Sequence, residues 1–447
     1  MPSEPCAFSA VLPENVTLAD WLQYLESRHP RGEAGIELGL ERVRRVANAL
    51  RQQPFCPILT IAGTNGKGST AACLESILCR AGYRVGCYAS PHLLRYNERV
   101  RIMGEGASDA ALIAAFQRVE TARRAAGDVF LTYFEFGTLA AWETFVSAGC
   151  EVLVLEVGLG GRLDAVNLHD ADVAVVTTVD LDHREWLGAD REAIALEKAG
   201  IFRAQRPALC GDIQPPRSLV AHARELGAPL WHMGRDFGFQ KDDSRDTPRL
   251  QWKYWFQREG HRPIRRTLAY PGLRGGVQLK NATLALAALD LLAPRLPVTA
   301  QAIREGLLET RLPGRFQILP GRPAIVLDVA HNPQAAQALA ENLSGMGFYP
   351  NTHAVCGMLA DKDAQACVAA LSGNVTRWFL ATLEGVRGRT AETLARAVAA
   401  ADPGVSCQCH SSPEEAFAAA REVAGENDRI LVFGSFSTVA AVLGALG

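Results

Sequence analysis

Several features that would assign this chain to a specialised class of protein are missing from its sequence. No apolar run approaches the roughly 18 residues of a membrane-spanning helix, so we expect no membrane span. The first ten residues, MPSEPCAFSA, have no basic segment and no long apolar core, so we expect no secretory signal. The 46 basic residues nearly balance the 48 acidic ones, and the net charge of −2 gives no overall attraction to nucleic acid or an anionic membrane.

Paired cysteine spacing is missing too. The 11 cysteines form no C-x-x-C pair, and an odd number without framework spacing fits a reducing compartment, so we expect a cytoplasmic protein. Cys407, Cys409 and His410 form one cluster that resembles a metal site, but no second ligand pair stands at zinc spacing, which favours the end of a strand. No sequence feature indicates an oligomer interface, and a monomer is the default expectation.

The 447 residues, 48% hydrophobic and 21% charged, are typical of a globular protein of two or three domains. Short aliphatic runs at 56–63, 151–158 and 173–180 predict buried strands, and longer helical patterns at 110–127 and 133–149 lie between them. This alternation predicts an α/β domain with a mostly parallel sheet, of the P-loop ATPase type.

The segment from residue 214 to about residue 276 has a different character. It is flanked by proline, rich in charge, and alternates aromatic residues in LQWKYWF (250–256), which predicts antiparallel strands in place of a β–α–β unit. A helix is expected at 281–293, with Asn281 as its N-cap.

A proline-rich break at 294–299 predicts a domain boundary, with a first domain over 1–296 and a second, smaller, Rossmann-like α/β domain over 297–447. Predicted strands resume after the break at 324–330, 353–359, 377–383 and 429–435. The second domain has no G-x-G-x-x-G motif, so nothing supports dinucleotide binding there.

The segment IAGTNGKGST (61–70) is typical of a loop that binds phosphate, although it departs from the common pattern. A predicted strand precedes it and a helical pattern follows, so backbone N–H groups, the helix N-terminus and Lys67 can face an anion. The common pattern needs Gly five residues before the Gly-Lys pair and Ser or Thr directly after the lysine. Ile61 and Gly68 occupy those positions, so the hydroxyl that normally reaches Mg²⁺ is missing. The structural alternative is a glycine-rich turn with a solvated lysine.

Two candidate metal ligands lie at the ends of the following predicted strands. Glu156 interrupts the apolar run VLVLEVGLGG, where a charge is costly unless it is paired or bound to metal. His183 comes just after the next strand. Each alone is more often structural, but ligands of open α/β sheets bind at the carboxyl ends of strands, which favours an Mg²⁺–ATP site here.

Six segments together resemble the folylpolyglutamate synthase/dihydrofolate synthase family of the Mur ligase superfamily. They are GTNGKGS (63–69), SPHLLRYNERVRI (90–102), EVGLGGRLDAVN (156–167), DLDHREWLGADREAIALEKAGIFR (180–203), LPGRF (312–316) and LDVAHNP (327–333). The resemblance extends from about residue 18 to about residue 440. It implies that ATP converts a substrate carboxylate to an acyl phosphate, which the amino group of L-glutamate attacks.

The resemblance also implies two acceptors and a set of roles. Glutamate is added to dihydropteroate, giving dihydrofolate, and to the γ-carboxyl of folylpolyglutamates; the segment 182–203 resembles the bifunctional bacterial type. ATP is bound by Thr64, Asn65, Gly66, Lys67, Gly68, Ser69, Asn281, Arg315 and Asp328. Of two Mg²⁺ ions, one is held by Ser90 and Glu156 and the other by His183 near a carbamylated lysine, Lys198 (N6-carboxylysine). Lys67, Glu156, His183 and Lys198 form the catalytic set, and His331 and Asn332 lie near it with undefined roles.

For the pterin substrate the resemblance implies three segments. They contain Glu37, Leu38, Gly39 and Leu40; Thr132, Tyr133, Phe134 and Glu135; and Arg162, Leu163 and Asp164. Phe134 and Phe136 either stack on a pterin or pack a helix, and the sequence leaves both open.

Three alternative functions remain at this point. A Mur ligase for a UDP-linked peptide needs a further domain before the phosphate loop, and only about 60 residues precede it, which are too few. An ATP-binding regulatory module has no need of Glu156, His183 and Lys198 together. A folylpolyglutamate synthase with one activity differs only in its acceptors.

Overall fold

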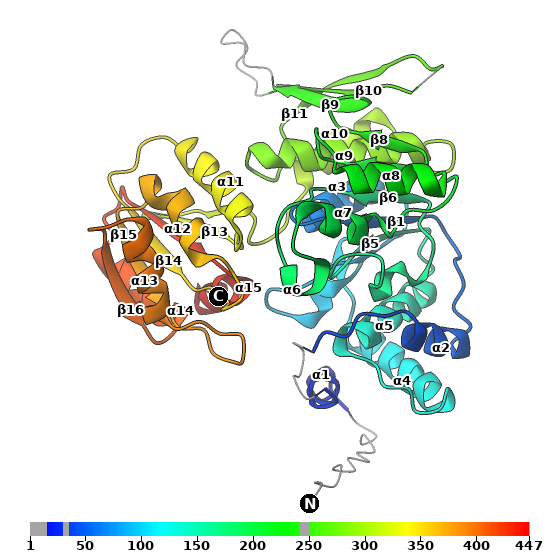
Figure 1. Cartoon of the computed structure of the whole chain (residues 1–447), viewed down its shortest axis with the longest axis horizontal. Helices are drawn as coiled ribbons and strands as arrows, with labels where there is room; N and C mark the ends of the chain where they lie inside the picture. The colour runs from blue at the N-terminus through cyan, green and yellow to red at the C-terminus, as the bar shows by residue number, and fades with distance from the viewer. Residues whose placement is uncertain (1–15, 30–34, 242–250, 259, 447) are drawn as a thin grey trace, which may run out of the picture.

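The computed structural model of the chain describes residues 16–29, 35–241, 251–258 and 260–446. Figure 1 shows two α/β lobes, with a small antiparallel sheet at one end of the first. No helix among the described residues is long and apolar enough to cross a membrane. The first ten residues, in which we expect no secretory signal, lie outside the described residues.

The first lobe contains an eight-stranded sheet in the order β4-β3-β2-β5-β1-β6-β7-β8. Its strands are β1 (Ile58–Ala62), β2 (Val85–Tyr88), β3 (Val100–Ile102), β4 (Glu105–Gly106), β5 (Val152–Glu156), β6 (Val173–Val176), β7 (Ala208–Cys210) and β8 (Leu230–His232). Along this order, every neighbouring pair from β2 onward to β8 is parallel. At the other edge β3 pairs antiparallel with β2, and β4 pairs antiparallel with β3. The predicted mostly parallel α/β architecture is confirmed.

Helices cover both faces of this sheet, which explains why its strands read as continuous apolar runs. The helices are α1 (Leu18–Ser27), α2 (Glu41–Ala49), α3 (Lys67–Arg80), α4 (Asp109–Ala125), α5 (Tyr133–Ser147), α6 (Arg184–Leu187), α7 (Arg191–Ala199), α8 (Arg217–Leu226), α9 (Gly276–Leu292) and α10 (Ala300–Glu309). In β1, Ile58 and Ala62 join the core beneath α4 and α5, while Leu59 and Ile61 join the core beneath α3 and α9.

The second lobe is a smaller α/β unit with a six-stranded sheet in the order β12-β13-β17-β14-β15-β16. Its strands are β12 (Gln317–Leu319), β13 (Ala324–Asp328), β14 (Thr352–Cys356), β15 (Arg377–Ala381), β16 (Ser406–His410) and β17 (Arg429–Phe433), and only β12 pairs antiparallel. Its helices are α11 (Pro333–Ser344), α12 (Ala364–Leu371), α13 (Ala391–Ala401), α14 (Pro413–Val423) and α15 (Phe436–Leu446). Cys407 and Cys409 lie exposed on the edge strand β16, which agrees with the strand interpretation of that cluster.

The segment after residue 214 was predicted only in part. The antiparallel sheet exists, formed by β9 (Phe237–Lys241), β10 (Gln251–Phe256) and β11 (Ile264–Ala269). It packs on α9, where Tyr254 and Arg266 donate to the carboxylate of Asp290. The prediction was wrong for the first part, because β7, α8 and the parallel strand β8 form a β–α–β unit there.

The prediction of Asn281 as an N-cap was also wrong. α9 begins at Gly276, after Gly275 with φ of 110°, so Asn281 lies within the second turn of the helix and is buried. Its amide donates to Gln278 Oε1 at 2.9 Å. The apolar pattern that suggested a later start marks only the part of α9 buried in the core.

The sequence-based boundary at 296/297 places α10 in the second domain. In the structure α10 packs on α3: Ser76 donates to the Gly306 carbonyl at 2.7 Å, and a side chain at Gly306 would collide with the backbone of Ile77. We therefore propose that the first domain extends through α10 and that the second begins near β12.

Candidate active site

The phosphate loop lies at the carboxyl end of β1, and α3 begins at its lysine. Gly66 has φ of 91°, a conformation that favours glycine, and a side chain there would collide with the amide oxygen of Asn281. Lys67 Nζ donates to the carbonyl oxygens of Gly63 (2.9 Å) and Thr64 (3.3 Å). Enclosure lowers the pKa of Lys67, while the Glu156 carboxylate acts in the opposite direction. The N-terminus of α3 and this ammonium make the loop suited to an anion.

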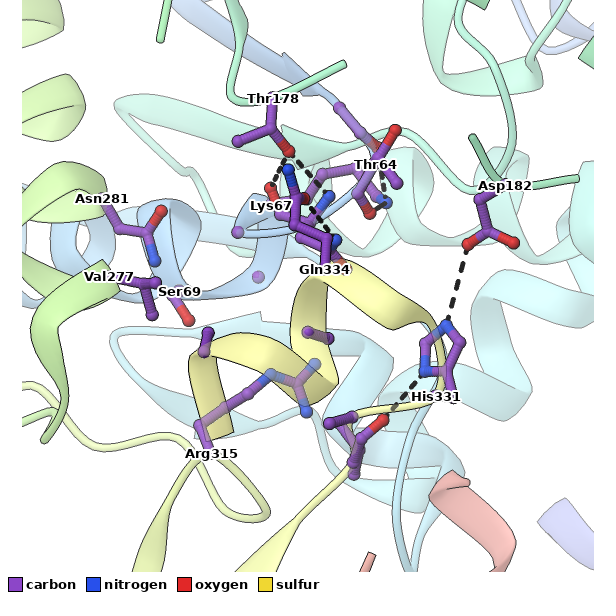
Figure 2. Close-up of a pocket in the computed structure, with 18 of the residues that line it drawn as sticks. Thr64, Lys67, Ser69, Thr178, Asp182, Val277, Asn281, Arg315, His331 and Gln334 are labelled. Atoms are coloured by element: carbon purple, nitrogen blue, oxygen red, sulfur yellow. Dashed lines mark hydrogen bonds and ion pairs between the residues drawn. The ribbon is translucent and has the colours of Figure 1, made fainter. Parts of the chain in front are cut away.

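A cavity of about 340 Å³ lies between the two lobes and contains most of the predicted site (Figure 2). From the first lobe it is lined by Thr64 to Ser69, Ser90, Glu156, His183, Lys198 and Asn281. From the second lobe it is lined by Arg315, Asp328 and His331. The structure thus brings together nearly all the residues predicted for ATP, metal and catalysis.

Glu156 ends β5 and is buried beside the phosphate loop. Its carboxylate accepts a hydrogen bond from the Ser90 backbone N–H, and burial raises its pKa, opposed chiefly by Lys67 and Arg315. A Cβ atom at Gly68 would lie 3.4 Å from Glu156 Oε2, so a side chain after the lysine would project toward this carboxylate. Glu156, held by the Ser90 backbone, therefore lies next to the position where the common loop carries its hydroxyl residue.

His183 and Lys198 form the other side of the cavity. His183 stands in the left-handed conformation (φ of 51°) at the start of α6, and burial lowers the pKa of its ring to about 4. Lys198 in α7 is buried, and burial lowers the pKa of its amine to about 7, with the Lys67 charge adding to the effect. The neutral amine that such a pKa makes available is the form that reacts with CO₂ to give a carbamate.

Arg315 and Asp328 face the loop from the second lobe. The guanidinium of Arg315 lies over the ring of Phe436, 5.0 Å from its centroid. Asp328 accepts hydrogen bonds from the backbone N–H groups of Phe316 and Ala330, both at 2.8 Å. Burial raises the pKa of Asp328, opposed by the charge of Arg315. The pair presents one cation and one acceptor to the cavity.

His331 and Asn332 connect the lobes. His331 Nδ1 lies 2.8 Å from the Val329 carbonyl oxygen, and Nε2 lies 3.9 Å from Asp182 Oδ2. Asn332 caps α11 by accepting from the Ala335 N–H, and its amide exchanges hydrogen bonds with the Asn65 amide at 3.0 and 3.1 Å. The phosphate loop therefore contacts the second lobe directly.

The three segments predicted for the pterin do not line this cavity, but they meet one another beside it. Arg42 pairs with Glu37 (3.1 Å) and Glu135 (2.9 Å), and the Gly39 N–H donates to the Leu163 carbonyl at 3.2 Å. Two of the predicted pterin residues also stabilise the fold, because Thr132 and Glu135 form the capping box of α5.

The segment that contains Arg162, Leu163 and Asp164 is held by hydrogen bonds. Asp164 is buried and accepts from the N–H groups of Leu159 (2.8 Å) and Val166 (2.9 Å), and burial raises its pKa to about 6. Arg162 pairs with Glu197 at 2.8 Å. These contacts fix the loop after β5 against α7.

The two phenylalanines of α5 have different environments. Phe136 is buried in the core against Phe116 and Trp21. Phe134 is only partly buried, and its ring lies against Gly158, which lines the cavity. Of the pair, only Phe134 is placed to contact a ligand.

Sequence reasoning missed several residues at the site, among them Thr178, Asp182, Gln278, Gln334 and Lys362. Thr178 accepts from the Asn65 N–H at 3.0 Å, and Gln334 accepts from the Asn65 side chain at 2.6 Å. Asp182 and Lys362 pair across the lobes at 2.7 Å. Lys362 stands in ADKD shortly after β14, so the rule of strand carboxyl ends would have indicated it.

The chemistry of the donor set fits a hard divalent cation. Among the described residues no three His, Cys, Asp or Glu side chains form a protein-only metal cage. Mg²⁺ usually takes one or two carboxylates and completes its shell with water and substrate phosphates. Ser90 and Glu156 beside the phosphate loop correspond to such a partial set.

Comparison with known proteins identifies the family of the chain through two domain matches. The Mur ligase middle domain matches residues 61–289, and the Mur ligase glutamate ligase domain matches residues 314–436. The chain therefore belongs to the Mur ligase family, and it is an ATP-dependent amide-forming ligase.

Within this family the similarity is to enzymes of folate metabolism. The chain is 45% identical over 429 residues to the dihydrofolate synthase/folylpolyglutamate synthase of Escherichia coli, covering 95% of this chain and 94% of that protein. The structure of Escherichia coli FolC in complex with DHPP and ADP superposes with a TM-score of 0.87, at 44% identity over 96% of this chain and 98% of the other. A bifunctional folylpolyglutamate synthase/dihydrofolate synthase with Mn, AMPPNP and L-glutamate bound has a TM-score of 0.85 at 44% identity, over 97% and 98% of the chains. The family predicted from the sequence motifs is confirmed.

Proposed function

We propose that this ligase joins L-glutamate to dihydropteroate, giving dihydrofolate, and to the γ-carboxyl of folylpolyglutamates. The observation that carries the proposal is the cavity in which the phosphate loop, Glu156 and Lys198 of the first lobe face Arg315 and Asp328 of the second. Because the nucleotide would be enclosed by both lobes, water is excluded from the acyl phosphate. The relatives with DHPP and ADP, and with AMPPNP and L-glutamate, support these substrates.

The phosphates of ATP lie on the N–H groups of residues 64–69, with Lys67 against the transferred group. For this, Lys67 exchanges its contacts with the Gly63 and Thr64 carbonyls for phosphate oxygens. Asn281, Arg315 and Asp328 hold the rest of the nucleotide between the lobes. Little covalent work falls to the protein, since positioning and charge stabilisation dominate phosphoryl transfer.

We propose two Mg²⁺ sites. Ser90 and Glu156 would hold the first ion, and His183 with a carbamylated Lys198 would hold or order the second. A bound divalent cation neutralises phosphate charge and polarises the reacting oxygens. The low pKa of His183 keeps its ring neutral and able to act as a ligand.

A second cavity of about 650 Å³ shares His183 and His331 with the first and would admit the amino acid. Arg184 and Arg387 line it together with several carboxylates, Arg387 pairing with Asp361 at 3.2 Å, and the two guanidinium groups would bind the carboxylates of L-glutamate. The pterin would bind near the 37–40, 132–135 and 162–164 segments, with Phe134 at the border of the nucleotide cavity.

All residues in these roles come from one chain, so we also propose a monomer. The ten described cysteines are free thiols, which supports a cytoplasmic location. Sedimentation of the purified protein tests whether it is a monomer.

The dual activity is tested with purified protein, ATP, Mg²⁺ and tritiated L-glutamate. Label should enter both dihydropteroate and a reduced folate. Label in folate alone would assign the chain as a folylpolyglutamate synthase with one activity, and label in neither would reject the proposed substrates.

A further inference from the structure

A carboxylate outside the predicted catalytic set connects the two lobes. Asp182 Oδ1, in the loop after β6, accepts from Lys362 Nζ at 2.7 Å, and Lys362 belongs to the second lobe. Asp182 Oδ2 lies 3.5 Å from Asn332 Nδ2 and 3.9 Å from His331 Nε2. Three groups of the second lobe therefore converge on one carboxylate of the first (Figure 2 shows its contact with His331).

Asp182 also restrains its neighbour His183. The His183 backbone N–H donates to Asp182 Oδ1 at 2.9 Å, and the ring Nε2 lies 3.8 Å from Asp182 Oδ2. Asp182, His183 and His331 line both the 340 Å³ and the 650 Å³ cavities. They therefore border both the proposed nucleotide site and the proposed glutamate site.

Asn332 extends this network to the phosphate loop. Its amide donates to Asn65 Oδ1 at 3.0 Å as well as approaching Asp182, and Asn65 donates in return to Asn332 and to Gln334. A shift of α11 away from Asp182 would therefore also change the contacts of the phosphate loop.

The pair of Asp182 and Lys362 is sensitive to the loss of either partner because both side chains are nearly enclosed. The exposed fraction is 11% for Asp182 and 6% for Lys362. The nearby charged group on the second lobe, Asp361, is 3.6 Å from the same ammonium and more exposed, at 36%. Removal of Asp182 would leave the Lys362 ammonium with a weaker and more solvated partner.

We propose that Asp182 is a positioning residue for the ligation: through Lys362 and Asn332 it holds the lobes together so that His183 and His331 face the reacting carboxylate. This role rests on the proposed glutamate ligation. It requires no contact between Asp182 and the substrates.

The test compares Asp182→Asn, Lys362→Met and the double variant in the tritiated glutamate assay. Each single variant should lower kcat by at least about 30-fold, and the Kd of AMPPNP should rise by a smaller factor, because the loop N–H groups and Lys67 remain while Arg315 and Asp328 move with the second lobe. The double variant should be no slower than the slower single variant, since both changes break one pair. Asp182→Glu should recover part of kcat, and Glu426→Gln, an exposed change in the second lobe, should alter nothing.

Small-angle scattering with AMPPNP gives a readout independent of turnover. Asp182→Asn should have a larger radius of gyration than the wild type, with an unchanged circular dichroism spectrum at the assay temperature showing that each lobe stays folded. Should this variant fail to fold, Lys362→Met alone tests the pair in both measurements. A kcat within about twofold of wild type, losses that multiply in the double variant, or unchanged scattering would overturn the proposal. Absence of glutamate ligation in the wild type would reject the proposed function, while scattering would still test the pair.

Discussion

The backbone N–H of Ser90 donates a hydrogen bond to the carboxylate of Glu156, although the two residues are far apart in the sequence. Strand order explains this contact. β5 lies between β2 and β1, with Leu155 opposite Tyr88 and Glu156 opposite Ile61. The carboxyl ends of three adjacent strands therefore place Ser90, Glu156 and the phosphate loop in one row.

Replacement of Ser90 tests whether its hydroxyl holds the metal ion. Ser90→Ala removes that oxygen but keeps the backbone N–H that binds Glu156. The Mg²⁺ concentration for half-maximal activity should rise by about tenfold or more, with a smaller change in the KM for ATP.

Ser69→Ala is the matched change at the other serine that lines the cavity. Ser69 lies in the first turn of α3 and is proposed to bind phosphate, so this variant should raise the KM for ATP more than the Mg²⁺ requirement. The same Mg²⁺ shift in both variants would contradict the assignment of the metal to Ser90.

Lys67→Ala should abolish measurable turnover, with kcat lowered by on the order of a hundredfold or more. The ammonium is the one charged side chain of the phosphate loop itself. Arg80→Ala, at the opposite end of α3, is the control and should retain activity. Normal glutamate incorporation by the Lys67 variant would show that phosphate binds elsewhere.

Lys198 should carry a carbamate, and the modification should depend on pH. Its pKa is lowered to about 7, so the fraction of neutral amine rises as the pH increases through that value. At constant dissolved CO₂, activation should therefore increase between about pH 6 and about pH 8. Labelling with ¹³CO₂ and NMR detection of the carbamate carbon measures it directly.

Lys198→Ala should be inactive and should regain activity in part with a short carboxylate such as acetate. Lys198→Arg keeps a cation that cannot form the carbamate and should remain inactive. A Lys198→Ala enzyme with normal activity and no carbamate signal in the wild type would exclude this role.

Phe134 and Phe136 provide a matched pair on one helix. Phe134→Ala should raise the KM for dihydropteroate with little loss of stability, because the ring is only partly buried beside the cavity. Phe136→Ala should cost about 3–5 kcal/mol of the free energy of unfolding, since it leaves a cavity in the core. Chemical denaturation measures the stability of each variant, and steady-state kinetics measures its KM. A raised KM for Phe136→Ala alone, with Phe134→Ala unchanged, would contradict a pterin site beside Phe134.

The sequence was sufficient for the parts of the fold and site that depend on local patterns. Apolar runs located strands such as β1 and β5, positions at strand ends indicated Glu156 and His183, and the family resemblance indicated Ser90 and Lys198. Residues at the carboxyl ends of parallel strands must meet at one edge of the sheet, so the convergence of Ser90, Glu156 and His183 follows from topology, whereas Lys198 reaches the site from α7.

Features that depend on contacts between the lobes could not be predicted in this way. Asp182 and Lys362 lie 180 residues apart and pair only because the second lobe closes over the β6 loop. Asn281 looked like a helix start because burial in the core, and not the helix itself, begins near it. Phe134 and Phe136 stand two residues apart in one aromatic pattern, and only their packing shows that Phe136 is buried in the core while Phe134 lies beside the cavity.

In the proposed reaction ATP activates the substrate carboxylate as an acyl phosphate before glutamate attacks. Dihydropteroate labelled with ¹⁸O in its carboxyl group tests it, with mass spectrometry of the released phosphate after ligation. One labelled oxygen should pass into phosphate for each amide formed, since the carboxylate oxygen bonds to phosphorus. Phosphate free of label, with dihydrofolate formed in equal amount, would contradict it.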